Sequence, residues 1–171
     1  MMKEKMDRFE LSVQEWLGTP WIPRPVNLCL VFQVNCPGCF ILSLPQLERL
    51  QREWAPRGVG FFGLSTAFED FELNAPEHTH GLFHKRKVVG ETAKALLREN
   101  IDPAALEINF PVGIDRRLPD GRGETFARHK LPGTPTWLIL DEEQHILTGW
   151  FGHEDDEAVA HRLESLSRKE D

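Results

Sequence analysis

A short apolar strand that runs directly into two closely spaced cysteines constrains the fold of this chain more than any other feature. Residues 26–34, VNLCLVFQV, are nearly all apolar and rich in branched side chains, which is typical of a strand buried on both faces. Cys36-Pro37-Gly38-Cys39 follows almost at once. After it, apolar residues recur at steps of 4, 3, 3 and 4 positions: Phe40, Leu44, Leu47, Leu50 and Trp54. This spacing predicts one face of a helix, with a kink at Pro45. The cysteine pair is therefore expected at a strand-to-helix turn.

The remainder of the chain alternates predicted strands and helices. Further strands are predicted at 59–64, 110–114, 136–140 and 146–151, the last two as a hairpin, and helices at 85–101 and from 154–157 onward. The segments 65–84 and 115–130 are polar or charged, and 115–130 is expected to be mostly loop. This order predicts an α/β protein with a mixed sheet covered by helices. The 171 residues suit one domain, preceded by a loosely packed lead-in at 1–24.

Composition excludes several classes of protein. The chain has 20 Lys and Arg against 27 Asp and Glu, and a net charge of -7 argues against nucleic acid as a partner. The longest apolar run, residues 28–32, is too short to cross a bilayer, so no membrane association is expected. The first 16 residues alternate charge and apolarity instead of forming an apolar leader. We therefore expect a cytoplasmic protein, or a periplasmic one if a leader has been removed.

Two cysteines separated by two residues at a helix start can close a small redox disulfide. The unpaired amides of the first helical turn and the helix dipole favour the thiolate of the first cysteine, which is the attacking species. The second cysteine, one turn on, is close enough to attack a mixed disulfide. Pro37 suits the first helical position, and Gly38 keeps the turn small and the sulfur accessible. We assign Cys36 as the nucleophile and Cys39 as the resolving thiol.

A zinc site is the main structural alternative for the cysteine pair. Structural zinc takes four ligands, and the remaining cysteine, Cys29, lies inside the apolar strand, where it is expected to be an inert core residue. His78, His80 and His84 could complete such a site, but we interpret them as loop surface, with a weak transition-metal site as the alternative. We expect no metal and no organic cofactor.

A second turn supports the redox interpretation. Gly133-Thr134-Pro135 directly precedes the strand at 136–140. A proline has no N–H to donate to a neighbouring strand, so Pro135 is interpreted as part of a rigid turn into the strand, and its peptide bond is a candidate for the cis form. Together with the apolar strand, the cysteine motif, the hairpin and the closing helix, this turn resembles the thioredoxin-like superfamily. The resemblance covers residues 26–66 and 108–168. The extra helix between the second and third strands resembles the TlpA/AhpC-type redoxin branch.

The resemblance implies a fold and a set of site residues. The fold would be a three-layer α/β/α sandwich with a mixed central sheet, forming one domain over 1–171 with an N-terminal extension at 1–24 and a helical insertion at 67–107. Pro135 would be a cis-proline packed beside the cysteines, and the Thr134 backbone would pair with an extended substrate segment. Protein disulfides, or a partner redox protein, would be the substrates. Partner specificity is expected in the extension and the insertion.

The sequence departs from the family pattern near the cysteines. Leu30 stands where thioredoxin has a buried Asp, and Leu42 where TlpA-like proteins often carry a Glu; both acids are linked to proton transfer from the resolving thiol. Asn35 stands where Trp is common, and Pro45 comes one residue later than usual. Peroxiredoxins have a Thr three residues before their reactive cysteine, where this chain has Gln33, so a peroxidase is less favoured.

The leading hypothesis is thus a thiol–disulfide oxidoreductase with an antioxidant role. A non-enzymatic module that senses redox state or binds a protein partner through the same cysteine pair is the alternative, and a thiol peroxidase is the third possibility. The potentials of such cysteine pairs span about 150 mV, so the sequence leaves the direction of electron transfer open.

Overall fold

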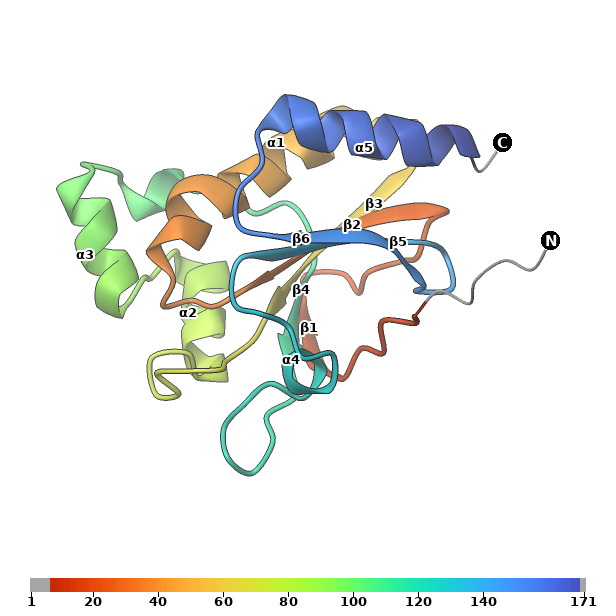
Figure 1. The fold of residues 1–171 in the computed structure, drawn as a ribbon. Coiled ribbons are helices and arrows are strands. Elements are labelled where there is room, and N and C mark those ends of the chain that lie inside the picture. Colours follow the sequence, from red (N-terminus) through yellow and green to blue (C-terminus); the bar gives the residue numbers. More distant parts are fainter. Residues whose placement is uncertain (1–6, 170–171) are drawn as a thin grey trace.

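The computed structural model describes residues 7–169, so the first six residues of the expected lead-in and the last two residues of the chain lie outside the described part. Six strands form one sheet in the order β1-β4-β3-β2-β5-β6 (Figure 1). The strands are β1 Val13–Leu17, β2 Val26–Phe32, β3 Val59–Ser65, β4 Val112–Asp115, β5 Thr136–Leu140 and β6 Ile146–Phe151. Strands β2, β3 and β4 are parallel, whereas β1, β5 and β6 pair antiparallel with their neighbours. The expected mixed sheet is confirmed.

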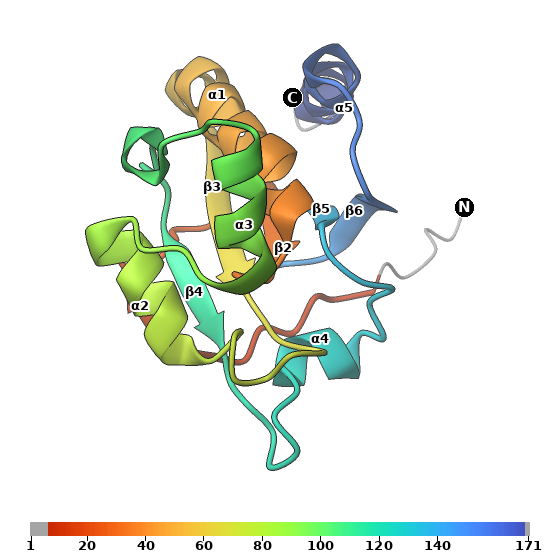
Figure 2. The ribbon, with the colours of Figure 1, turned by 90° about the vertical axis from the view of Figure 1, so that its left-hand side faces the viewer.

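Helices cover both faces of this sheet. The helical segments are η1 Cys39–Ser43, α1 Leu44–Trp54, η2 Ala55–Arg57, α2 Pro76–Lys85, α3 Gly90–Arg98, η3 Pro103–Ala105, α4 Glu124–Arg128 and α5 Asp156–Lys169. Figure 2 shows α1 and α5 above the sheet and α4 below it. Within residues 7–169, no helix has the length and apolarity needed to cross a bilayer.

The side chains of β2 divide between two cores. Leu28, Leu30 and Phe32 join the core that α1 and α5 cover, whereas Cys29 and Val31 join the core under α4 and the N-terminal segment. This alternation is the period of two that a strand imposes, and burial of each large side chain contributes about 1.5–3 kcal/mol. All seven residues of β2 are buried, as the apolar run predicts. The expected three-layer α/β/α sandwich is confirmed.

The insertion contains two helices where the sequence predicted one. Helix α2 lies in the polar segment 65–84 and ends one residue beyond it. Pro76 is in its first turn, where a backbone N–H has no helical hydrogen-bond partner, so its absence costs nothing. The helix is capped by Arg86, which has φ of 53° and whose guanidinium donates to the backbone oxygens of Leu82 and Phe83. The prediction of one helix over 85–101 is therefore wrong at its start, because this arginine closes α2 there and α3 begins only at Gly90.

Other local expectations also change. His78, His80 and His84 lie on α2 and not on a loop. Pro45 lies in the first turn of α1, directly after the π-helical turn η1, so the helix is irregular next to the position where the sequence predicts a kink. The charged segment 115–130 contains the short helix α4.

Candidate redox site

The cysteine pair lies where β2 leads into the first helix. Pro37 is the first helical residue, and the Cys39 amide donates to the Cys36 carbonyl oxygen at 3.1 Å. Cys36 is half-buried, whereas Cys39 is fully buried. Both are free thiols, and their sulfur atoms lie 2.7 Å apart. The geometry brings together the two predicted thiols and exposes only the one assigned as the nucleophile.

The two thiols differ in acidity because they differ in hydrogen bonding and burial. The hydrogen bond from the Cys39 thiol lowers the pKa of Cys36 from 9.0 to about 6, with further help from the Thr134 side chain and the Cys39 amide. Burial and the charge of Glu69 oppose this decrease. Burial first, and then the hydrogen bond to Cys36, raises the pKa of Cys39 well above its ordinary value. At neutral pH the exposed sulfur is thus the better nucleophile.

The predicted proline turn lies against the nucleophile. The Thr134-Pro135 peptide bond is cis, and the Cys36 Sγ lies 3.9 Å from the Thr134 carbonyl oxygen. The hydroxyl of Thr136 donates to the Gly133 carbonyl oxygen at 2.6 Å, and the Gly152 amide donates to the Pro135 carbonyl oxygen at 2.9 Å. These bonds hold the turn in place beside the cysteines. Residues that are 98 positions apart in sequence therefore share one site.

The third cysteine is separate from this site. Cys29 lies in the middle of β2 and is fully buried. Burial, followed by the charge of Asp115, raises the pKa of its thiol well above the ordinary value. A thiol with this environment is poorly reactive, consistent with its expected role as a small core residue.

The histidines on α2 do not approach the arrangement of a metal site. The His80 and Glu15 side chains are 2.8 Å apart, and the rings of His80 and His84 stack with centroids 5.6 Å apart. Within residues 7–169, no cluster of three or more His, Cys, Asp or Glu side chains is arranged to hold a metal ion.

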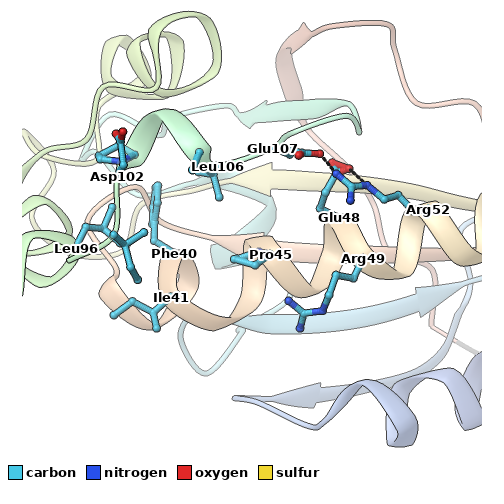
Figure 3. Close-up of a pocket in the computed structure, with 13 residues that line it drawn as sticks. Phe40, Ile41, Pro45, Glu48, Arg49, Arg52, Leu96, Asp102, Leu106 and Glu107 are labelled. Carbon is cyan, nitrogen blue, oxygen red and sulfur yellow. Dashed lines mark ion pairs between the residues drawn. The ribbon is translucent and has the colours of Figure 1, made fainter. Parts of the chain in front are cut away.

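A cavity of about 270 Å³ lies between the first helix and the insertion (Figure 3). Phe40 and Pro45 line one wall, and Leu96 and Leu106 line the other. The guanidinium of Arg52 forms ion pairs with the carboxylates of Glu48 and Glu107 at its edge. Neither Cys36 nor Cys39 lines this cavity, so the reactive chemistry lies outside it.

Sequence reasoning missed three buried polar residues around the cysteine motif. Gln33 and Asn35 flank the end of the apolar run, and Asn74 lies in the insertion; all three are buried. Polar residues beside a reactive cysteine were visible in the sequence, but nothing indicated which backbone groups they would bond. Their contacts connect the insertion to the redox loop.

Comparison with known proteins identifies the fold. The sequence matches no protein-family model and no curated protein. Several solved structures match over nearly the whole chain, among them the following three. A thiol-disulfide isomerase from Corynebacterium glutamicum is 27% identical, with a TM-score of 0.73 over 96% of this chain and 97% of its own. A thioredoxin-like superfamily protein is 24% identical, with a TM-score of 0.71 over 95% and 96%. The solution structure of an oxidized thioredoxin-like protein is 13% identical, with a TM-score of 0.62 over 98% and 99%. In its fold, cysteine pair and proline turn, the chain is similar to thioredoxin-like proteins.

Proposed function

We propose that the protein is a thiol–disulfide oxidoreductase that acts on protein disulfides or on a partner redox protein. The observation that carries this proposal is the asymmetry of the two thiols. Cys36 is partly exposed and has a pKa of about 6, whereas Cys39 is buried, has a raised pKa and lies within bonding reach of the first sulfur. One thiol is suited to attack a substrate and the other to resolve the product.

The proposed reaction has two exchange steps. The Cys36 thiolate attacks one sulfur of the substrate disulfide, whose S–S bond breaks, and the second substrate sulfur leaves and takes up a proton. Cys39 then loses its proton and attacks the Cys36 sulfur, which releases the first substrate sulfur as a thiol. The substrate gains two electrons and two protons, and the protein is left with a Cys36–Cys39 disulfide. A dithiol partner protein reduces this disulfide, and the reverse sequence oxidises a substrate.

The surface next to Cys36 suits an extended polypeptide. Pro37 and Gly38 form the accessible side of the turn, and the Thr134-Pro135 turn lies opposite. We propose that the Thr134 backbone hydrogen-bonds the substrate as an added strand would, while Pro135 packs beside the mixed disulfide. The isomerase from Corynebacterium glutamicum, which matches over nearly the whole chain, supports an activity of this class. The cytoplasmic location and the antioxidant role stay predictions.

Trapping tests the proposal. In the Cys39→Ser variant, step two is blocked, so a substrate protein should remain bonded to Cys36 as a mixed disulfide. The wild type should reduce insulin disulfides in the presence of dithiothreitol, and Cys36→Ser should neither reduce nor trap. Cys29→Ala serves as the matched control and should behave like the wild type. A wild type that reduces no disulfide, together with a Cys39→Ser variant that traps none, would rule the activity out.

A redox-sensing or protein-binding module is the second candidate, and one observation favours it. Leu30 is fully buried where thioredoxin has an acid, and Leu42 is exposed where TlpA-like proteins often carry a Glu, so neither position supplies an acid for proton transfer from Cys39. Slow turnover with a difference in partner binding between the oxidised and reduced forms would favour this module. A peroxidase is less favoured, because the Gln33 side-chain oxygen accepts the Phe68 amide at 2.9 Å and the position offers no hydroxyl.

A further inference from the structure

Asn35, the residue directly before the nucleophile, bonds three separate parts of the insertion. It is only 7% exposed. Its amide N–H donates to Asn74 Oδ1 at 2.7 Å, and its side-chain Nδ2 donates to Asp70 Oδ2 at 3.1 Å. Its Oδ1 accepts the amide N–H of Glu91, in the first turn of α3, at 2.8 Å. One buried side chain therefore joins the loop before α2, the start of α3 and the redox loop.

Two neighbouring amides complete this connection. The Gln33 Oε1 accepts the Phe68 amide at 2.9 Å and the Asn74 Nδ2 at 3.2 Å. The same Nδ2 also donates to the Glu69 carbonyl oxygen at 2.8 Å. Gln33 is 1% exposed and Asn74 is fully buried. We call Gln33, Asn35 and Asn74 the amide clamp.

The amide clamp has the properties of a positioning device. Buried polar groups are costly when unpaired, about 1–3 kcal/mol each, so a network with its partners in place resists any movement that breaks it. The amide clamp hydrogen-bonds the backbone of Asn35, which is one residue from Cys36. It also hydrogen-bonds the backbone of Phe68 and Glu69. Movement of the redox loop relative to the insertion would break several of these bonds at once.

The reactivity of Cys36 depends on geometry that such a clamp would preserve. Hydrogen bonds to sulfur weaken steeply as donors move or rotate. The groups that lower the pKa of Cys36 belong to Cys39 and Thr134, which lie in different segments of the chain. The loop that carries Cys36 must therefore be fixed against both.

We infer that Asn35 is a positioning residue for the redox site: by bonding the insertion, it holds the Cys36 sulfur in place against the hydrogen-bond donors that activate it. The inference rests on the proposed function for its biological meaning. The insertion is then more than a surface addition, because it is one side of the support that keeps the nucleophile reactive.

Asn27 supplies a matched control at the opposite end of β2. It is fully buried, its Oδ1 accepts from the Trp21 indole at 3.1 Å and from the Arg24 amide at 2.9 Å, and its Nδ2 donates to the Leu140 carbonyl oxygen at 3.2 Å. Asn27→Ala and Asn35→Ala thus remove comparable buried networks, one near the start of β2 and one three residues beyond its last residue. Only the second touches the redox loop.

The test measures iodoacetamide alkylation of Cys36 in the reduced protein against pH, with the site identified by peptide mass. Asn35→Ala should shift the midpoint upward and slow alkylation at pH 6 by roughly tenfold. Asn27→Ala should leave the profile at the wild-type position, although it also destabilises the fold. An unchanged profile in Asn35→Ala, or an equal shift in Asn27→Ala, would overturn the inference.

A charge-conserving exchange keeps the inference testable if Asn35→Ala does not fold. Asn35→Asp places a second carboxylate beside Asp70, so it should disturb the clamp and shift the profile. The double variant Asn35→Asp/Asp70→Asn lets the amide introduced at position 70 donate to the carboxylate introduced at position 35, and it should move the profile back from that of Asn35→Asp toward that of the wild type. A double variant no better than Asn35→Asp would contradict the inference. Alkylation needs no substrate turnover, so these results stand apart from the insulin assay that tests the proposed function.

Discussion

The two ends of β2 carry similar buried amides that serve different purposes. At the first end, Asn27 bonds the N-terminal segment through Trp21 and the hairpin through Leu140. At the second end, Asn35 bonds the insertion through Asp70 and Glu91. The Asn27 network contacts no residue of the redox site. The Asn35 network is one residue from Cys36, a half-buried thiol with a lowered pKa.

This difference shows how two segments that the sequence predicts as additions, 1–24 and 67–107, are joined to β2. Each addition is joined to the same central strand by a buried Asn, because amide side chains both donate and accept and can bond irregular backbone. The N-terminal addition gains stability from this connection. The insertion gains, in our account, a role in the reactivity of Cys36.

The first prediction compares Cys29, in the middle of β2, with Cys36, in the turn that follows the strand. Cys36→Ser should lower disulfide exchange by about 1000-fold or more, because the attacking sulfur is lost. Cys29→Ala removes a buried thiol from the middle of β2 and should leave the rate within about twofold, at a cost of about 1–2 kcal/mol in stability. Insulin reduction and urea unfolding measure the two quantities. Equal rate losses in the two variants would break the distinction.

The next largest effect concerns Gly60, which lies against the Asn27 network. A methyl group added there would collide with the Asn27 Oδ1 and press on the Trp21 indole nitrogen. Gly60→Ala should therefore lower the free energy of unfolding by about 2–4 kcal/mol, through overpacking and a broken hydrogen bond. The Cys36 alkylation profile should stay where it is. Gly81→Ala, on α2 with only ordinary contacts nearby, is the control and should stabilise by about 0.5–1 kcal/mol.

Gly90 is the counterpart of Gly60 at the other end of the strand. It has φ of 56°, and a methyl group there would meet the Asn35 Oδ1 at 2.5 Å and Leu73 Cδ1 at 3.0 Å. Gly90→Ala should cost about 1–3 kcal/mol in unfolding free energy, from backbone strain and the displaced amide. It should also slow Cys36 alkylation at pH 6, unlike Gly60→Ala. Identical Cys36 alkylation profiles for Gly60→Ala and Gly90→Ala would show that the Asn27 and Asn35 networks do not differ in their effect on Cys36.

A further contrast concerns stability against pH. The pKa of Cys36 is about 6 in the folded protein and 9.0 in its ordinary state, so folding releases a proton between these values. The stabilising contribution is fully present above the unfolded pKa and is lost as pH falls through the folded one. Under reducing conditions, the stability of the wild type relative to Cys36→Ser should therefore increase between pH 6 and 8.5. Parallel stability curves for the two proteins over this range would contradict the shift.

Much of the fold could be predicted because its signals are local. The continuous apolar run of β2, the hairpin around residues 141–145 and the helix after the cysteines each have a period or composition of their own. The cysteine spacing placed the nucleophile at a helix start, and the proline turn appeared in the sequence as a motif. Resemblance to a family then brought these separate segments together.

The rest depends on contacts between distant segments. Helix α2 was missed because its stretch is polar and its end is set by the Arg86 guanidinium, which bonds the Leu106 carbonyl oxygen from across the insertion. The amide clamp was missed for a similar reason. Asn35 and Asn74 are 39 positions apart, and an isolated polar residue gives no sign of its distant partner. Asn35 was visible only as a departure from the family pattern.

The pH dependence of Cys36 alkylation in the reduced wild type can show whether Cys36 is the nucleophile. Cys36 should be modified first, and its rate should follow a single ionisation with a midpoint near 6. Cys39 and Cys29 should stay unmodified in the folded protein over the same range. A midpoint near that of an ordinary thiol, or modification of Cys39 before Cys36, would contradict the assignment of nucleophile and resolving thiol.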